Sequence, residues 1–221
     1  MKMVRHLLFD LDGTIADTAP DLAQALNLLR EEHDRPALDL ARIRPLVSAG
    51  AAAMICDAFA ISAQAPQFSA LRERFLAIYS ENICCHTRLF PGMDQVLDYL
   101  DAEKIRWGIV TNKPGWLTMP LLDAMALDRR SACIVSGDTL PLRKPHPEPL
   151  LHACRLMACR PEETAYIGDA HTDIQAGATA GMATGLALYG YLEPDAQPHS
   201  WGADILFHKP LDILDWLPVK P

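Results

Sequence analysis

The sequence has little of what marks several classes of protein. Its 20 Lys and Arg face 28 Asp and Glu, a net charge of −8, and no basic run could follow a nucleic-acid backbone. No apolar stretch approaches eighteen residues, so we expect neither a membrane span nor a membrane partner. The six cysteines lack a Cys-x-x-Cys pair and the eight histidines a His-x-x-x-His pair, which disfavours a disulfide framework or zinc site. We expect a soluble cytoplasmic protein without nucleic-acid partners.

Apolar runs typical of β-strands recur along the chain and stop at small or polar residues. With 221 residues, about half of them apolar, the chain can bury a core of its own. The expected strands are 7–9, 107–110, 132–135 and 165–167, and helical patterns cover 93–103, 116–126, 148–158 and 173–180. Alternation of strand and helix predicts an α/β fold with a doubly wound parallel sheet.

The segment after the first strand breaks this alternation. Helical patterns at 20–32, 51–60 and 68–82 follow one another without a convincing strand. We therefore expect a catalytic core made of residues 1–16 and 87–221, with a helical cap formed by residues 17–86. An insertion that leaves and re-enters near a crevice can exclude water and recognise substrate, although a helical decoration without a role is the alternative.

Asp10-Leu11-Asp12-Gly13-Thr14 follows directly on the apolar run 7–9. Two carboxylates this close repel each other at the mouth of a packed sheet, so the pair calls for a metal ion or a shared proton. Asp-Gly is also an ordinary turn former, and the pentapeptide alone leaves that alternative open. Whether the segment is a chemical site or an ordinary turn depends on whether other parts of the chain supply partners for the two carboxylates.

Polar residues follow the later strands as well. Thr111-Asn112 ends the run 107–110, Arg143-Lys144-Pro145 lies in a Pro-rich turn, and Gly168-Asp169-Ala170-His171-Thr172-Asp173 follows the run 165–167. Ligands of open parallel sheets bind outside the carboxyl ends of the strands. These segments are therefore expected to meet in one crevice with the Asp10 segment.

Four such motifs in this order resemble the haloacid dehalogenase superfamily of phosphohydrolases, and the insertion is similar to that family's helical cap of the first type. The resemblance implies a phosphatase in which Asp10 is the nucleophile and forms an aspartyl-phosphate. Asp12 would act as general acid and base, a residue that the dehalogenases lack. Thr14 fits the phosphatase form of the motif, whereas Val would suggest a phosphomutase.

The resemblance also assigns the remaining site residues. Thr111 and Lys144 complete the catalytic set, and Gly13 and Asn112 would bind the phosphate. Mg²⁺ would be held by the carboxylates of Asp10 and Asp169 and the backbone carbonyl of Asp12, while Asp173 would orient metal-bound water or Lys144. The flanking cations Lys113 and Arg143 could reach substrate or project into solvent, and His171 receives no role.

The substrate, a small phosphate ester, is indicated by a narrower resemblance. Asp17-Thr18-Ala19-Pro20 and Lys144-Pro145-His146-Pro147 are similar to bacterial phosphoglycolate phosphatases. Val47-Ser48-Ala49-Gly50-Ala51, Tyr189-Gly190-Tyr191 and 198–204 resemble N-acetylmuramic acid 6-phosphate phosphatases of cell-wall recycling, which makes Ser48 and Gly50 candidate substrate-binding residues. We favour the sugar phosphate over phosphoglycolate. A sugar phosphomutase and a non-catalytic binding protein are further alternatives, and the protein could be a monomer or a dimer.

Overall fold

A single parallel sheet forms the centre of the molecule. The computed structural model describes residues 4–217, and within them six strands pair in the order β5-β4-β1-β6-β7-β8. All five pairings are parallel, which confirms the predicted α/β class. The strands are β1 (His6–Phe9), β4 (Trp107–Val110), β5 (Ile134–Val135), β6 (Thr164–Gly168), β7 (Ala183–Ala187) and β8 (Ile205–Phe207).

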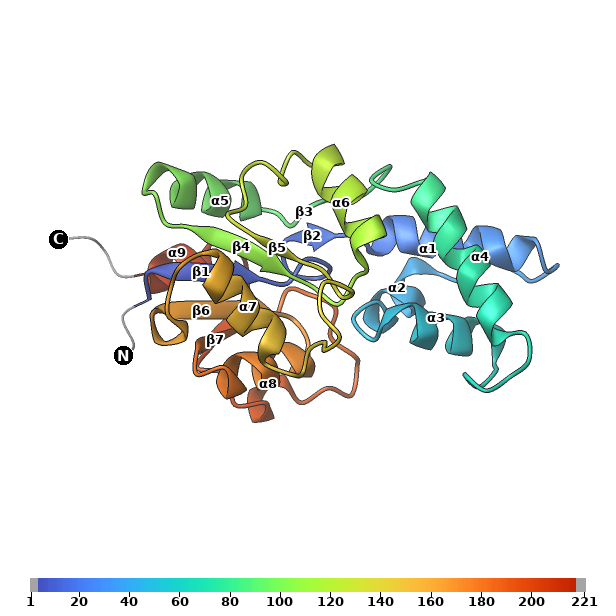
Figure 1. Cartoon of the computed structure of the whole chain (residues 1–221). Helices are drawn as coiled ribbons and strands as arrows, with labels where there is room; N and C mark the ends of the chain where they lie inside the picture. Colours follow the sequence, from blue (N-terminus) through green and yellow to red (C-terminus); the bar gives the residue numbers. More distant parts are fainter. Residues whose placement is uncertain (1–3, 218–221) are drawn as a thin grey trace.

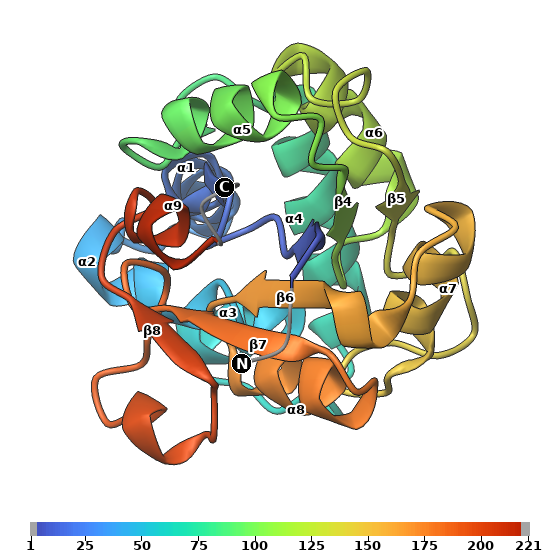
Figure 2. The same cartoon turned by 90° about the vertical axis from the view of Figure 1, so that its left-hand side faces the viewer.

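Helices cover both faces of this sheet, as Figure 2 shows with α5 and α9 on one side and α7 and α8 on the other. Side chains of a strand alternate between the faces: Leu7 and Phe9 belong to the larger apolar cluster, which includes residues of α5, α6 and α9. Leu8 belongs to the second cluster, against α7 and α8. The helices around the sheet are α5 (Met93–Ala102), α6 (Gly115–Ala124), α7 (Glu148–Leu156), α8 (His171–Thr179) and α9 (Asp212–Trp216).

The helical insert lies between β2 (Ala16–Asp17) and β3 (Arg88–Leu89), two short strands that pair antiparallel and form its neck. In Figure 1 the insert extends beyond one end of the sheet. Its elements are α1 (Ala19–Glu31), α2 (Leu40–Ile43), the 3₁₀ turn Arg44–Leu46, α3 (Gly50–Phe59) and α4 (Phe68–Glu81). Helices α1 and α4 pack on each other, and Phe75, Ile78 and Tyr79 of α4 are buried.

Most sequence-based boundaries agree with the structure within two or three residues, but four strands have no counterpart among the expected ranges. Strand β7 reads Ala-Thr-Gly-Leu-Ala and lacks the β-branched apolar run that indicates a strand. It forms because β6 and β8 flank it on both edges. Strand β8 has three residues, and the neck strands β2 and β3 have two each, too short for a periodic pattern.

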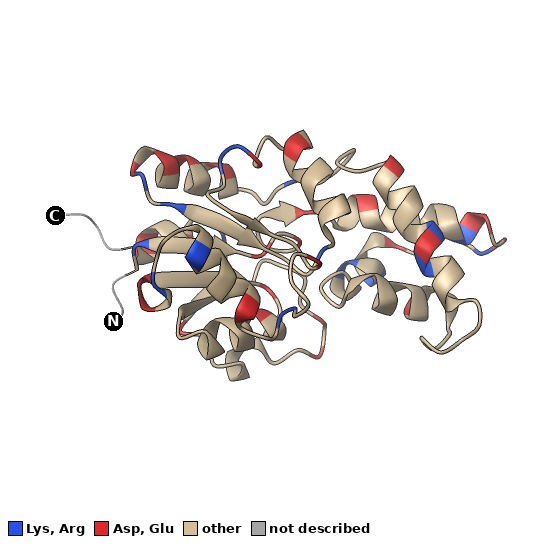
Figure 3. Ribbon diagram, in the orientation of Figure 1, with Lys and Arg blue, Asp and Glu red and all other residues tan. Residues whose placement is uncertain are grey.

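No helix among residues 4–217 combines the length and the apolar character that crossing a bilayer requires. All six cysteines are free. In the view of Figure 3, basic and acidic residues are interspersed over both the sheet region and the helical insert.

Candidate active site

The carboxyl ends of the three central strands bring the sequence motifs together. Phe9, the last residue of β1, lies beside Ile109 of β4 on one side and Ile167 of β6 on the other. The residues that follow these positions, Asp10 and Asp169 among them, are therefore neighbours in space. Oxygen atoms of Asp10, Asp169 and Asp173 lie within 4.8 Å of one another.

Lys144 is the cation at the centre of this acidic cluster. Its side chain is only 2% exposed, and Nζ lies 2.9 Å from Oδ1 of Asp10 and 2.7 Å from Oδ1 of Asp173. Nζ also donates to the Tyr166 hydroxyl over 2.8 Å. The ammonium is thus fixed by three oxygens, and the pairing of Lys144 with the expected nucleophile is present in the structure.

Asn112 positions the backbone of Lys144. Its amide nitrogen donates to the Lys144 carbonyl (3.0 Å), and its amide oxygen accepts the Lys144 N–H (3.1 Å). The side chain borders the cavity described below, but both ends of its amide are engaged by the Lys144 loop. The Asn112 side chain therefore fixes the backbone of the loop that carries Lys144. Its place at a strand end did not indicate this contact.

Burial dominates the electrostatics of Asp10. Although Lys144 lowers the pKa of this carboxyl, desolvation and the nearby charge of Asp173 outweigh it and raise the pKa to about 7. The same desolvation, with the charges of Asp10 and Asp173, raises the pKa of Asp169 well above its ordinary value. The site therefore holds more carboxylate charge than Lys144 alone can balance.

Asp169 lies against the turn that carries the first motif. Its Oδ2 accepts hydrogen bonds from the Tyr191 N–H (2.9 Å) and from Ser48 Oγ (2.8 Å), and its Oδ1 from Thr14 Oγ1 (3.3 Å). Gly13 has a φ of +83°, and a Cβ there would stand 2.1 Å from Asp169 Oδ2. Only glycine allows this close approach of the turn to the carboxylate.

The carboxylates suit a hard divalent cation such as Mg²⁺, which takes oxygen ligands and keeps several waters. Asp10 and Asp169 supply such oxygens at the strand ends. The two oxygens of Asp173 are already engaged, Oδ1 by Lys144 and Tyr166 and Oδ2 by the Ala170 N–H. Asp173 thus contacts Lys144 directly, and its part in orienting the lysine or metal-bound water stays a prediction.

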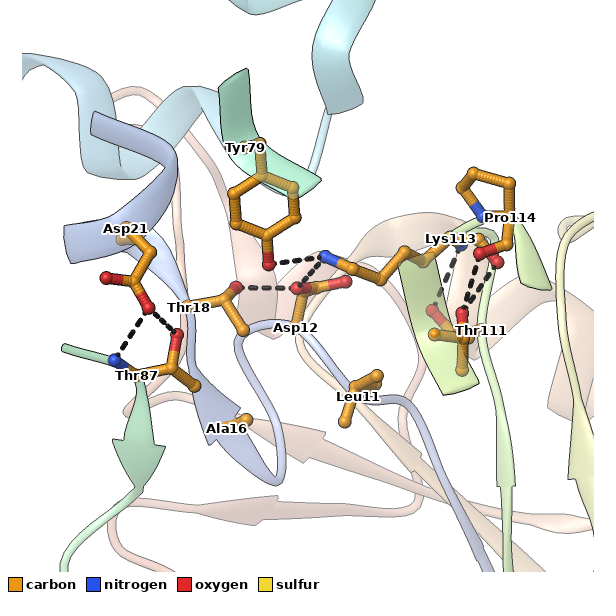
Figure 4. A network of polar contacts seen from close by, with 12 residues as sticks. Leu11, Asp12, Ala16, Thr18, Asp21, Tyr79, Thr87, Thr111, Lys113 and Pro114 are labelled. Atoms are coloured by element: carbon orange, nitrogen blue, oxygen red, sulfur yellow. Dashed lines mark hydrogen bonds and ion pairs between the residues drawn. The ribbon is translucent and has the colours of Figure 1, made fainter. Parts of the chain in front are cut away.

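Asp12 belongs to a separate network that reaches the insert (Figure 4). Its Oδ1 lies 3.0 Å from Lys113 Nζ and accepts a hydrogen bond of 2.6 Å from Thr18. Lys113 Nζ also donates to the hydroxyl of Tyr79, a buried residue of α4, over 2.9 Å. The Lys113 side chain is 7% exposed, so it is a buried link between Asp12 and the insert and does not project into solvent.

Thr111 precedes this lysine at the end of β4. It is buried, and its hydroxyl oxygen accepts the backbone N–H of Lys113 over 3.2 Å. The short turn that this bond closes directs the Lys113 side chain toward Asp12, as Figure 4 shows. The sequence singled out Thr111 as a candidate, and it gave no indication of the contacts that join Lys113 to Asp12 and Tyr79.

A cavity of about 340 Å³ opens over these residues, between the sheet and the insert. Asp10 and Asp12 border it from the sheet, and Ser48 and Gly50 from the insert. Gly50 has a φ of +83°, a conformation that favours glycine at the start of α3. The apolar side chains of Leu22, Val47, Met54, Leu76 and Leu117 also line the cavity, and so do two arginines, Arg72 and Arg143.

The segment around Tyr191 closes the site from the side of β7. The Tyr191 hydroxyl donates to Asp17 Oδ1 over 2.8 Å, and Arg44 of the insert forms a two-pronged ion pair with the same carboxylate. A Cβ on Gly190 would stand 2.4 Å from the Gly13 carbonyl oxygen. The Tyr-Gly-Tyr sequence is thus packed directly on the first motif.

His171, which has no assigned role, packs its ring against Trp201.

Comparison with known proteins agrees with this geometry. The family model for haloacid dehalogenase-like hydrolases matches residues 7–187. N-acetylmuramic acid 6-phosphate phosphatase of Pseudomonas putida is 39% identical over 210 residues, which is 95% of this chain and 94% of that protein. Phosphoglycolate phosphatase of Xanthomonas campestris pv. campestris is 40% identical over 218 residues, 99% of this chain and 97% of that protein.

Solved structures show the same fold. A crystal structure described as a predicted phosphoglycolate phosphatase from Haemophilus somnus superposes with a TM-score of 0.85 at 28% identity and covers 97% of this chain and 98% of its own. The family match spans most of the chain and includes every strand end that carries a motif. The protein therefore belongs to the haloacid dehalogenase-like hydrolase family, among its phosphatases.

Proposed function

We propose that the protein is a Mg²⁺-dependent phosphomonoesterase that works through an aspartyl-phosphate on Asp10. The observation that carries the proposal is the position of Asp10, which borders the cavity with Lys144 at 2.9 Å and Asp169 beside it. A carboxylate held between a cation and a divalent-metal site can attack phosphorus while its own charge stays compensated.

The reaction follows from the residues around it. An Asp10 oxygen attacks the phosphorus atom, the bond from phosphorus to the ester oxygen breaks, and Asp12 gives that oxygen a proton. Water then attacks the phosphorus of the aspartyl-phosphate, Asp12 takes its proton, and phosphate leaves as Asp10 is regenerated. In the structure Oδ1 of Asp12 lies beside Lys113 Nζ and accepts a hydrogen bond from Thr18, and these contacts hold the carboxyl group at the border of the cavity.

Mg²⁺ would be held by the carboxylates of Asp10 and Asp169 and the backbone carbonyl of Asp12. When bound, the ion would neutralise charge on the phosphoryl oxygens in the transition state. Lys144, 2.9 Å from Asp10, would help to balance the same charge, and Thr111 and the Gly13 turn would position the phosphate. Six free cysteines suit the reducing cytoplasm, where we propose that the enzyme acts.

We propose N-acetylmuramic acid 6-phosphate as the substrate, which would give the enzyme a place in cell-wall recycling. A cavity of about 340 Å³ with both polar and apolar lining suits an N-acetylated sugar better than a two-carbon acid. The Pseudomonas relatives carry that name, at 39% and 37% identity. The alternative substrate is 2-phosphoglycolate, which the names of several relatives of similar identity contain.

Steady-state kinetics on the purified protein test the proposal. With Mg²⁺ present we expect hydrolysis of p-nitrophenyl phosphate and a higher kcat/KM for N-acetylmuramic acid 6-phosphate than for 2-phosphoglycolate. Asp10→Asn should abolish turnover, while the same change at Asp123, exposed on α6, should not. Phosphate transferred between hexose positions would indicate a mutase, and no turnover of any ester would indicate a non-catalytic protein.

A further inference from the structure

Two cations on the wall of the cavity have no acidic partner. Arg72 on α4 and Arg143 in the loop before Lys144 both border the cavity and are exposed. Within residues 4–217 neither forms an ion pair, although other arginines of the insert do, such as Arg44 with Asp17 and Arg74 with Glu32. Unpaired guanidinium groups beside a substrate cavity are suited to an anionic group on the ligand.

The position of Arg72 on its helix also suits contact with an anionic group of the ligand. Arg72, Leu76 and Tyr79 are the residues of α4 that border the cavity, and their spacing of four and three residues places them on one face. Tyr79 lies at the end of that face nearest the expected phosphate position, because its hydroxyl accepts a hydrogen bond from Lys113, which pairs with Asp12 (Figure 4). Arg72 lies seven residues away, about 10 Å along the helix axis.

This separation distinguishes between anionic groups on a substrate. If the phosphate is bound at Asp10, Arg72 lies near the opposite end of the ligand. In phosphoglycolate four bonds of about 1.5 Å join phosphorus to a carboxylate oxygen, a span of roughly 5 Å. In N-acetylmuramic acid 6-phosphate nine bonds across the sugar ring and the lactyl ether join them, so the carboxylate can lie roughly twice as far away.

We propose that Arg72 binds the carboxylate of the substrate and thereby selects a sugar acid phosphate over the corresponding neutral sugar phosphate. The inference rests on the proposed phosphatase function and adds a specificity-determining residue to it. Arg72 contributes the distal contact from the insert, and the sheet supplies the reacting groups. Arg143, which precedes Lys144 in the core, lies outside this assignment.

The test compares two sugars that differ only in the lactyl group. We would measure kcat/KM for N-acetylmuramic acid 6-phosphate and N-acetylglucosamine 6-phosphate with the wild-type protein, Arg72→Gln, Arg72→Lys and Arg143→Gln. Arg74→Gln is the matched control, because Arg74 lies about 200° around the same helix and pairs with Glu32 away from the cavity. p-Nitrophenyl phosphate reports the chemistry alone.

We expect Arg72→Gln to lower kcat/KM for the muramic acid ester about tenfold or more, mainly through KM, because a charge-assisted hydrogen bond is lost. Activity on the glucosamine ester and on p-nitrophenyl phosphate should be unchanged, and Arg72→Lys should recover part of the loss. Arg74→Gln should resemble the wild type on all three substrates.

Other outcomes separate the two proposals. Equal losses on both sugars, no loss on either, or a selective loss with Arg143→Gln in place of Arg72→Gln would overturn the role of Arg72. Selective impairment of 2-phosphoglycolate hydrolysis by Arg72→Gln would support the carboxylate contact and contradict the choice of a sugar. Failure of the wild-type protein to hydrolyse p-nitrophenyl phosphate with Mg²⁺ would reject the phosphatase mechanism itself.

Discussion

Replacing Asp10 by Asn should stabilise the metal-free protein while removing its activity. Asp10 is 13% exposed and lies close to Asp169 and Asp173, so its charge is costly in the folded state. Asn has the same shape and no charge. Because Lys144 keeps its contact with Asp173 at 2.7 Å, the substitution leaves that lysine paired.

The size of the effect follows from the pKa of Asp10, which rises from 3.8 to about 7 on folding. Each pKa unit corresponds to about 1.4 kcal/mol, so the ionised carboxyl costs the folded state about 4 kcal/mol at pH 8. A raised acid pKa means that this cost is absent below pH 4, grows between pH 4 and 7 and is complete above that range. At pH 5 the cost is about 2 kcal/mol.

Urea denaturation in EDTA, followed by circular dichroism at pH 5 and pH 8, measures this difference. Asp10→Asn should have the larger free energy of unfolding at both values, and its advantage should be about half as large at pH 5. Asp123→Asn removes an exposed charge and serves as the control. If Asp10→Asn proves less stable than the wild type at pH 8, Lys144 stabilises the carboxylate by more than burial costs, and the reasoning is refuted.

The remaining predictions concern the metal and the two buried lysines. Because Asp10 carries a proton below about pH 7, Mg²⁺ affinity measured by calorimetry should weaken as pH falls from 7 to 5.5, and an unchanged affinity would show that no proton is displaced. Lys144→Met should lower kcat for p-nitrophenyl phosphate by about 100-fold or more, since the transition state loses its fixed cation; a change below tenfold would contradict this role. Lys113→Met leaves Asp12 without its ion pair and should lower the free energy of unfolding by about 3 kcal/mol in urea, whereas Tyr79→Phe should cost about 1 kcal/mol. Equal costs for these two variants would contradict the view that the ion pair is the stronger contact.

The parts of the site that the sequence could predict are those fixed by the backbone. Asp10, Thr111 and Asp169 each follow an apolar run, and the geometry of a parallel sheet then brings them to one edge. Gly13 was a candidate for phosphate binding, and the structure adds that a Cβ at this position would collide with Asp169. The short strand β7 was missed, since its flanking strands and not its own residues determine it.

The contacts between the insert and the sheet could not be predicted in this way. Lys113 follows a recognised motif, but its pairing with Asp12 and Tyr79 depends on how α4 lies over the sheet. Ser48 was selected as a candidate for binding substrate, and its hydroxyl donates to Asp169. Arg72 has no distinguishing neighbour in the sequence, and only the cavity shows its place. Long-range packing, which has no periodic sequence signal, decides each of these contacts.

The excess negative charge at the sheet edge both lowers the stability of the metal-free protein and suits the site to a divalent cation. Asp10, Asp169 and Asp173 carry three negative charges when ionised, and the ammonium group of Lys144 balances one of them. The remaining excess of two matches the charge of Mg²⁺. Without the ion, burial forces the excess to be relieved by protons, which is why the pKa values of Asp10 and Asp169 rise. The same imbalance that weakens the metal-free fold would therefore favour binding of the proposed ion, and a metal-bound protein should regain the stability that the carboxylates cost.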